Sequence, residues 1–342
     1  MNRRSFLTAV VLTGSLALTA CGSSEDGEAY TPDPEALQIY SSQHDNVTKA
    51  WADAFTKKTG IKTQVRQGKD ASMGHQIVEE GDRSPADVFL TENSPAMTLV
   101  DSAGLLAPVD AATLQAIPED RRPSSRTWTA IAARSTVLVY NPDKISEDEL
   151  PTSLMDLQRP EWKDRWGCGA SGADFQAIVA GMLADQGEEK TTAWLEALKD
   201  GARIYQNNIA TMKAVNAGEV PVGVMYHYYW YRDQAGTKEG SGSTKLHYFK
   251  NEDPGAFVSL SGGGVLKSSD KAEQAQQFLA YVTSPEGQQV LVDSGSMEYA
   301  VAEGVDSDPA LPPLDSLEAP PVDPFGLSSE KVTELMTDAG IL

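Results

Sequence analysis

Residues 37–60 read LQIYSSQHDNVTKAWADAFTKKTG and contain the pattern that decides the fold. The first four residues form an apolar run of strand length, and Val47, Trp51 and Phe55 follow at helical spacing. Asp45 is a helix-capping residue ahead of them, and the closing glycine ends the helix. A short buried strand followed by an amphipathic helix is the building unit of α/β proteins.

The same alternation continues along the chain. Further strand-like runs lie at residues 87–90, 136–140, 222–225 and 258–266, with helical patterns between and after them. This order predicts mainly parallel sheets. Because 342 residues suffice for two cores, we expect two α/β lobes whose connections cross more than once.

Charge and cysteine usage exclude several classes of protein. There are 49 acidic and 28 basic residues, giving a formal net charge of −21, which is unfavourable for binding nucleic acid. The two cysteines, Cys21 and Cys168, do not form a disulfide framework, because the first is expected to be modified. Cys168 is expected to be a buried structural thiol.

The N-terminus has the features of an export signal. Arg3 and Arg4 precede an uncharged run to Ala20 that is too short to span a membrane. The run ends in LTAC, which resembles a bacterial lipobox and predicts lipidation of Cys21. RRSFL also resembles a twin-arginine signal, so export in the folded state and export through the Sec route both stay open. A polar tether follows the cysteine.

Polar side chains follow several predicted strands, where α/β proteins bind ligands. They are His44, Glu92, the turn Ser171-Gly172-Ala173, and the pair Tyr228 and Tyr229. Each alone has an ordinary explanation: a capping histidine, a carboxylate at a helix N-terminus, or aromatic core residues.

Taken together, these residues fit a hard metal ion. One imidazole, one carboxylate and two phenolates carry −3 and would balance Fe³⁺, whereas zinc and copper prefer nitrogen and sulfur. Octahedral coordination leaves two positions, and the 171–173 turn before a helix is suited to hold an anion there.

Five stretches, in a fixed order along the chain, carry a resemblance to a known family. They read IYSSQH (39–44), ADAFTKKTGIK (52–62), RSPADVF (83–89), YYW (228–230) and DPGA (253–256). Together they closely resemble the bacterial ferric-binding proteins, the iron(III) receptors of ABC importers. The similarity runs from about residue 37 nearly to the C-terminus.

This resemblance implies an α/β, two-lobe periplasmic-binding-protein fold of type II-like topology with a hinged ligand cleft. It implies Fe³⁺ ligands at His44, Glu92, Tyr228 and Tyr229. It also implies a synergistic anion, namely phosphate, carbonate or citrate, at the positions Asn93, Ser171, Gly172, Ala173 and Asn208.

The sequence departs from the family pattern at two anion-site positions. Familiar members have a glutamine where this chain has Asn93, and an asparagine where it has Tyr226. Both departures are at residues assigned to the anion, and neither is at a residue assigned to the iron. Relatives with another tyrosine near the 171–173 turn need no phosphate, and Ser171 indicates that this chain is not one of them.

The implied domain organisation is a signal at 1–20 and a lipidated cysteine with its tether at 21–35. Lobe 1 would comprise 36–135 and about 259–309, and lobe 2 about 136–258 and 310–342. The hinge is expected at two crossing strands near 134–141 and 246–258.

The implied protein is not an enzyme. It would be a monomeric receptor, lipid-anchored to the outer face of the cytoplasmic membrane, that delivers Fe³⁺ to the permease and ATPase of an ABC importer. Two alternatives stay open. One is a receptor of the same fold for another ligand, such as an oxyanion or a polyamine. The other is an exported metal-dependent hydrolase, for which the sequence offers no nucleophile and base in a known arrangement.

Overall fold

The computed structural model describes residues 30–342, so the predicted signal and the lipidation site at Cys21 lie outside the described residues. Residues 32–342 form one unit. None of the helices within residues 30–342 has the length and apolar character that crossing a membrane needs.

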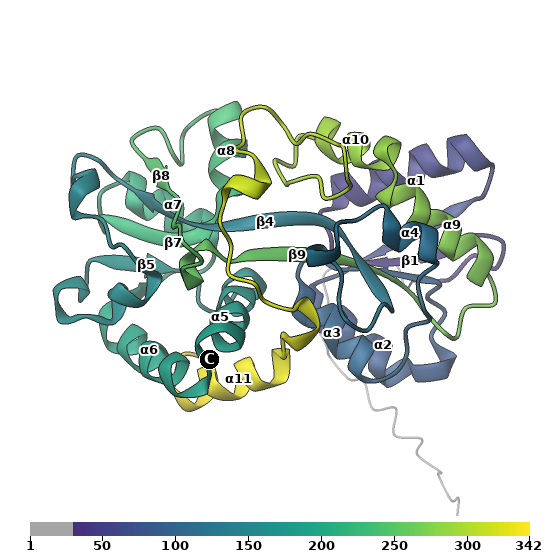
Figure 1. Ribbon diagram of the computed structural model, residues 1–342, viewed down its shortest axis with the longest axis horizontal. Helices are drawn as coiled ribbons and strands as arrows, with labels where there is room; N and C mark the ends of the chain where they lie inside the picture. Colours follow the sequence, from purple (N-terminus) through teal and green to yellow (C-terminus); the bar gives the residue numbers. More distant parts are fainter. Residues whose placement is uncertain (1–29) are drawn as a thin grey trace, which may run out of the picture. The chain divides into compact units, whose positions relative to one another are not determined.

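Strands and helices alternate along the chain, as the sequence predicts (Figure 1). The strands are β1 (Leu37–Ser41), β2 (Thr63–Gln67), β3 (Val88–Leu90), β4 (Trp128–Tyr140), β5 (Trp166–Cys168), β6 (Ala202–Ile204), β7 (Val222–Tyr226), β8 (Lys245–His247) and β9 (Val258–Val265). The helices are α1 (Asp45–Thr59), α2 (Asp70–Glu80), α3 (Ser94–Ser102), α4 (Ala111–Gln115), α5 (Ala173–Gln186), α6 (Glu188–Gly201), α7 (Asn208–Asn216), α8 (His227–Ala235), α9 (Ala272–Thr283), α10 (Pro285–Asp293) and α11 (Ser329–Asp338).

Two long antiparallel strands join the halves of the sheet. The order is β2-β1-β3-β9-β4-β7-β5-β6, with β8 also paired to β4. Strand β4 pairs with β9 over Trp128–Ser135 and with β7 over Thr136–Tyr140, so one strand serves both halves. The outer pairs β1–β2, β1–β3, β5–β6 and β5–β7 are parallel. The predicted α/β fold with two lobes is confirmed. The expectation of mainly parallel sheets is wrong, because β4 pairs antiparallel with β7, β8 and β9, and β3 also pairs antiparallel with β9.

The first strand and helix show how local sequence builds this fold. All five residues of β1 are buried. Val47, Trp51 and Phe55 form the buried face of α1, and Gly60 ends the helix with a left-handed φ of 79°. The N-cap is His44 rather than Asp45, which is the first helical residue. Since the His44 side chain does not cap the helix, it is free to face the interior of the molecule.

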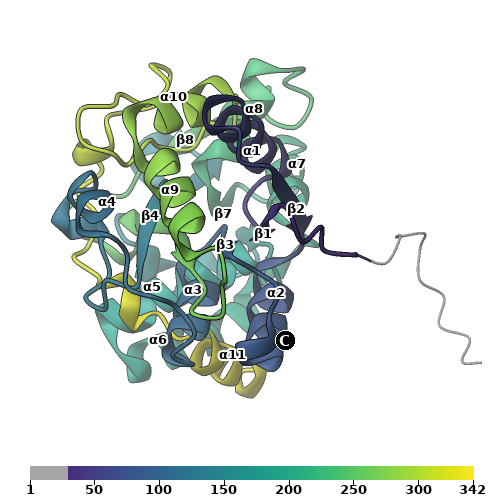
Figure 2. The ribbon, with the colours of Figure 1, turned by 90° about the vertical axis from the view of Figure 1, so that its right-hand side faces the viewer.

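Separate hydrophobic clusters lie on either side of the β4–β9 pair. One packs α1, α9 and α10 against the sheet, through residues such as Trp51, Phe278 and Leu291. The other packs α5, α6 and α11 against β5 and β7, through Phe175 and Trp194. Figures 1 and 2 show these helix groups on opposite sides of the two central strands. This arrangement is compatible with the predicted lobes, whose exact boundaries stay a prediction.

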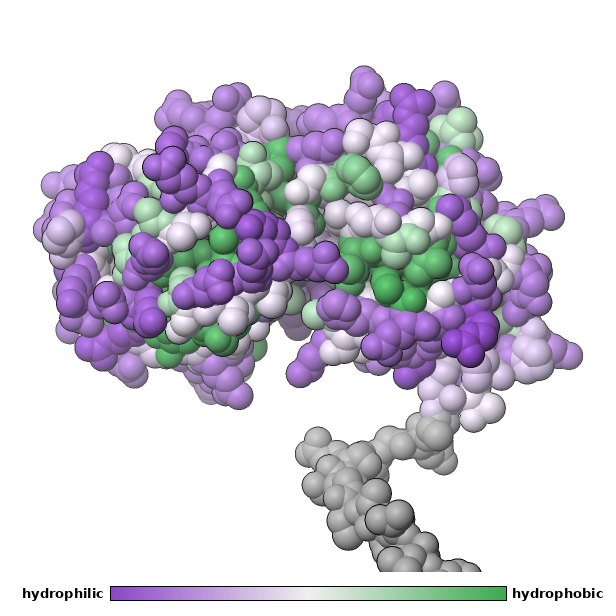
Figure 3. Space-filling view, turned by 90° about the horizontal axis from the view of Figure 1, so that it is seen from below, coloured by the Kyte–Doolittle hydropathy of each residue, from purple (hydrophilic) through white to green (hydrophobic). Residues whose placement is uncertain are grey.

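The second crossing strand lies later in the chain than the sequence suggested. It is β9, which begins at Val258, whereas residues 246–258 contain the end of β8 and a short 3-10 turn at Pro254–Ala256. Seen from below, most of the surface is hydrophilic, with apolar residues in patches between (Figure 3).

Candidate metal centre

Two of the predicted ligands come from the half of the sheet that contains β1 and β3. His44 follows β1 as the N-cap of α1, and Glu92 lies between β3 and α3. The His44 Nε2 atom is 3.7 Å from Glu92 Oε1. Both side chains are mostly buried, with 17% and 23% of their surface exposed.

The tyrosine pair approaches from the other half, at the start of α8. The Tyr228 hydroxyl lies 3.1 Å from Glu92 Oε1 and 3.2 Å from Asp174 Oδ2. The Tyr229 hydroxyl donates to Asp174 Oδ2 at 2.9 Å. The two phenol rings stack with centroids 4.2 Å apart, and His44 meets the Tyr228 ring edge-on at 5.1 Å. The structure therefore brings all four predicted ligands together.

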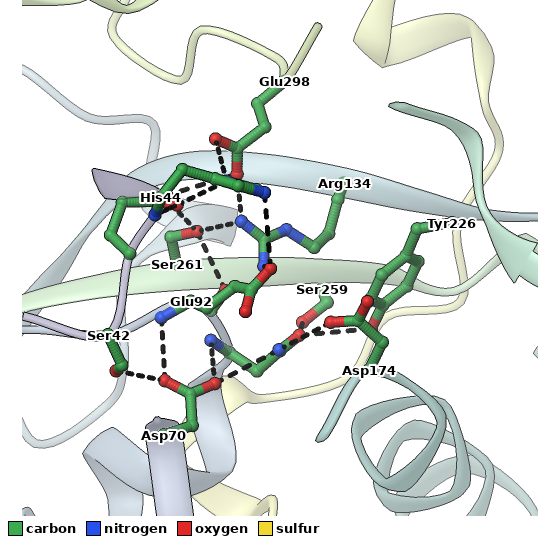
Figure 4. A network of polar contacts seen from close by, with 12 residues as sticks. Ser42, His44, Asp70, Glu92, Arg134, Asp174, Tyr226, Ser259, Ser261 and Glu298 are labelled. Carbon is green, nitrogen blue, oxygen red and sulfur yellow. Dashed lines mark hydrogen bonds and ion pairs between the residues drawn. The ribbon is translucent and has the colours of Figure 1, made fainter. Parts of the chain in front are cut away.

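Asp174 is the residue that sequence analysis missed. It lies in the first turn of α5, is 6% exposed, and accepts from both the amides and the phenols. Figure 4 shows Asp174 within the network of polar contacts. Asn93 Nδ2 donates to its Oδ1 at 3.1 Å, and Asn208 Nδ2 donates to its Oδ2 at 2.7 Å. With the two tyrosine hydroxyls, four donor groups converge on one carboxylate. Its place in the first helical turn, directly after the predicted anion-binding turn, is the signal that could have identified it.

The predicted anion-binding residues divide into two groups. Asn93 and Asn208 lie in the cluster through their bonds to Asp174. The hydrogen bonds of the turn stay within its own neighbourhood: Gly172 N–H bonds to Gly169 O, and the Ser171 carbonyl accepts from Gln176. Ser171 and Ala173 are exposed. Their role in binding an anion stays a prediction.

Tyr226 lies beside this cluster. Its hydroxyl is 3.4 Å from Asn93 Oδ1, and the same oxygen accepts from Ser259. Tyr226 therefore helps to orient an amide whose nitrogen faces Asp174.

Arg134 and Glu298 were also missed, and both are wholly buried behind the ligands. The Arg134 guanidinium forms an ion pair with Glu298 and lies 3.3 Å from Glu92 Oε1 (Figure 4). It also covers the Tyr228 ring at 5.4 Å. An arginine in the otherwise uncharged run 128–140 is the sequence signal for such a role, since buried charges are rare unless paired.

The acidic groups of the cluster perturb one another. Burial, followed by the carboxylates of Asp174 and Glu92, raises the pKa of Tyr228 well above 10.0. The same causes raise the pKa of Tyr229. Burial and Asp174 also raise the pKa of Glu92, against the effect of Arg134. Burial alone would raise the pKa of Glu298 as well, but Arg134 and His44 hold it well below its usual range.

This arrangement of acceptors suits a small, highly charged cation. Within residues 30–342, there is no group of three or more His, Cys, Asp or Glu side chains that could hold a metal ion by itself. The candidate site therefore depends on the phenols, which are oxygen donors once deprotonated.

The other histidines do not join the site as ligands. His75 is exposed, and His247 is partly buried on β8. None of these three histidines matches a ligand of the family, which predicts surface or capping residues. For His227 this prediction is wrong, because the ring is wholly buried and its Nδ1 accepts from Ser135 N–H at 3.1 Å. Burial lowers the pKa of His227 to about 3. Cys168 is a buried free thiol, as expected.

Comparison with known proteins gives consistent similarities. A family model described as bacterial extracellular solute-binding protein matches residues 83–323. The chain is 53% identical over 340 residues to the Fe(3+)-binding periplasmic protein of Serratia marcescens, covering 99% of both. Iron-bound HitA from Pseudomonas aeruginosa has a TM-score of 0.83 at 42% identity, covering 90% of this chain and 100% of that one.

A further solved structure is the Trichodesmium protein IdiA or FutA in complex with iron and citrate, with a TM-score of 0.79 at 30% identity over 90% of this chain and 100% of that one. The resemblance inferred from the sequence is thus confirmed over almost the entire chain. This chain belongs to the family of bacterial extracellular solute-binding proteins, in the group of the ferric iron-binding proteins that its sequence resembles.

Proposed function

We propose that this protein is the Fe³⁺ receptor of an ABC importer. The observation that carries the proposal is the convergence of His44, Glu92, Tyr228 and Tyr229, from both halves of the sheet, on one buried acidic cluster. Carboxylate and phenolate oxygens are hard donors that match a trivalent ion. The relatives named for ferric iron support the same ligand.

We infer a division of roles between the lobes. Tyr228 and Tyr229 would capture the ion, and His44 and Glu92 would complete its coordination when the cleft closes about the crossing strands. The proposed lobes are 36–135 with about 259–309, and about 136–258 with 310–342. The function is binding and release, without bond chemistry.

We further propose that Asp174 supplies the negative charge that an external anion would otherwise provide. Asn93 and Asn208, the two side chains assigned to the anion, both donate to this carboxylate. Arg134 and Glu298 form a neutral buried pair, so the charge around the ion comes from the two phenolates and Glu92, which carry −3, and from Asp174, which adds a fourth negative charge against the +3 of Fe³⁺. Phosphate, carbonate or citrate could then still bind at Ser171, Gly172 and Ala173, but iron binding would not require it.

The cellular setting is also proposed. The chain would be exported, as its periplasmic relative is, and anchored by lipid on Cys21 to the outer face of the cytoplasmic membrane. From there a monomer would deliver Fe³⁺ to the permease and ATPase of the importer. Four groups that hold a highly charged cation, rather than a nucleophile paired with a base, support a receptor over a hydrolase.

Metal analysis and a visible spectrum of protein purified without added iron test this function. Tyrosinate-to-iron charge transfer should give a visible band with about one iron per chain. A colourless protein that binds an oxyanion or a polyamine instead would favour a receptor for another ligand, and turnover of an ester or phosphoester would favour the hydrolase.

A further inference from the structure

The amide of Gln43 has only one acceptable orientation. One of its terminal atoms lies 2.7 Å from the backbone N–H of His44, which can only donate, so this atom is the oxygen Oε1. The amide nitrogen then faces two acceptors, Ser261 Oγ at 3.0 Å and Glu298 Oε1 at 3.3 Å. All polar neighbours of the Gln43 amide agree with this assignment.

That orientation determines which nitrogen of His44 carries a proton. Nδ1 lies 2.9 Å from Gln43 Oε1 and 3.3 Å from Glu298 Oε2, and both of these oxygens are acceptors. Nδ1 must therefore be the protonated nitrogen in the neutral ring. Nε2 is left with its lone pair, and it points toward Glu92 Oε1 at 3.7 Å.

Glu298 is itself held in place from the opposite side. It is wholly buried, and its Oε1 forms an ion pair with Arg134 Nη2. Arg134 is fixed in turn by Ser261 Oγ at 3.0 Å, and Ser261 donates to the backbone carbonyl of Glu92 at 2.9 Å. The carboxylate therefore cannot turn away from His44 without breaking its buried ion pair with Arg134.

We propose that Glu298, with Gln43 and Arg134, is a positioning residue that fixes His44 as an Nε2 metal ligand. This rests on the proposed iron-binding function. Glu298 does not touch the ion, and it acts by orienting the imidazole and by keeping the proton on the nitrogen that faces away from the metal. Such partners of metal-binding histidines raise affinity because the ligand does not have to rearrange on binding.

The variant Glu298→Gln separates orientation from packing, because it keeps the size of the side chain. Its single carbonyl oxygen is needed by Arg134, so its amide nitrogen must face His44 Nδ1. Only Gln43 then still favours a proton on Nδ1. We expect the population of the Nε2-protonated ring to rise, and the affinity for Fe³⁺ to fall by roughly 10- to 100-fold.

The test combines two measurements on the full mature chain. Long-range ¹⁵N–¹H NMR of the metal-free protein reports the His44 tautomer, and chelator competition reports the affinity for Fe³⁺. Asp87→Asn is the matched control, because Asp87 is an equally buried carboxylate that accepts from Gln38 N–H and Ser269 Oγ, away from the site. The control should keep both the wild-type tautomer and the wild-type affinity.

An Nε2-protonated neutral His44 in the wild type would overturn the proposal, as would Glu298→Gln with an unchanged tautomer and affinity. If Glu298→Gln fails to fold, Gln43→Met removes the other acceptor while keeping the Arg134–Glu298 pair, and it must shift the tautomer in the same direction. If the wild type binds no Fe³⁺, the proposed function fails, and the tautomer measurement alone decides the role of Glu298.

Discussion

Replacing Asp174 by asparagine should weaken iron binding strongly and create a need for an external anion. Asp174 Oδ2 accepts from Asn208 and from Tyr229, so the remaining carbonyl oxygen would stay there. The new amide nitrogen would then face Asn93 Nδ2, which donates to Oδ1 in the wild type. The variant thus removes one negative charge and places two donors against each other.

The size of the effect follows from the charge balance. With Arg134 and Glu298 counted as a neutral pair, the two phenolates, Glu92 and Asp174 carry −4 against the +3 of Fe³⁺, and without Asp174 they carry −3. Losing a charged, hydrogen-bonded group beside the ion costs about 1.5–3 kcal/mol, which corresponds to a fall in affinity of roughly one to two orders of magnitude. The metal-free variant should be somewhat less stable than wild type, because the new amide nitrogen opposes Asn93 Nδ2 and removes one of its acceptors.

The assay is iron release to a chelator, followed by the visible band, with and without phosphate, carbonate or citrate. Asp185→Asn makes the same change at an exposed position near the other end of α5 and should behave as wild type. Asp174→Asn should recover part of its retention when an anion is added, whereas wild type should depend little on it. Wild-type retention in the variant, with no response to any anion, would refute the role assigned to Asp174.

Three further predictions concern the ligands and protons. Tyr228→Phe and Tyr229→Phe should each lose most iron binding, because each removes an anionic oxygen. The visible band should shift or disappear while the fold is kept. Unaltered colour and iron retention in either variant would contradict this ligand assignment. Burial and nearby carboxylates raise the pKa of Tyr228, so the phenols are protonated in the metal-free protein. Because Fe³⁺ must displace these protons, the affinity for Fe³⁺ should rise with pH. An affinity that does not change with pH would contradict this. Folding lowers the pKa of His227 from 6.5 to about 3, so between these pH values the unfolded chain binds a proton that the folded chain does not. The free energy of unfolding should therefore decrease as pH falls through this range. Urea unfolding of His227→Phe should show a shallower decrease.

Local sequence predicted the positions of the four candidate ligands because each of them follows the end of a strand. Val47, Trp51 and Phe55 reveal their helix through spacing alone, and this helix places His44 at the end of β1. The same argument places Glu92 after β3 and the tyrosines after β7. Strand β7 runs opposite to β1 and β3, so its carboxyl end faces theirs near the middle of β4, and the ligands from the two halves converge there.

The residues behind the ligands could not be predicted in this way. Glu298 is 254 positions from His44 along the chain, and only the packing of the loop after α10 brings the two together. Arg134 lies on a strand whose residues are all buried, and a strand pattern does not tell which partner compensates the charge. His227 was misjudged for the same reason, since the backbone N–H that it accepts from belongs to β4.

Asp174 illustrates which properties of an anion site a family motif predicts and which it does not. The turn at 171–173 with Asn93 and Asn208 indicates that donors surround a negative charge, but it does not say which molecule carries that charge. Here a carboxylate two residues after Gly172 accepts from both amides and lies within 3.2 Å of both phenol oxygens. A covalently attached anion is present at every binding event, so its contribution does not depend on anion concentration. Iron retention by this protein should therefore vary little with the anions around it, and Asp174→Asn should restore that dependence.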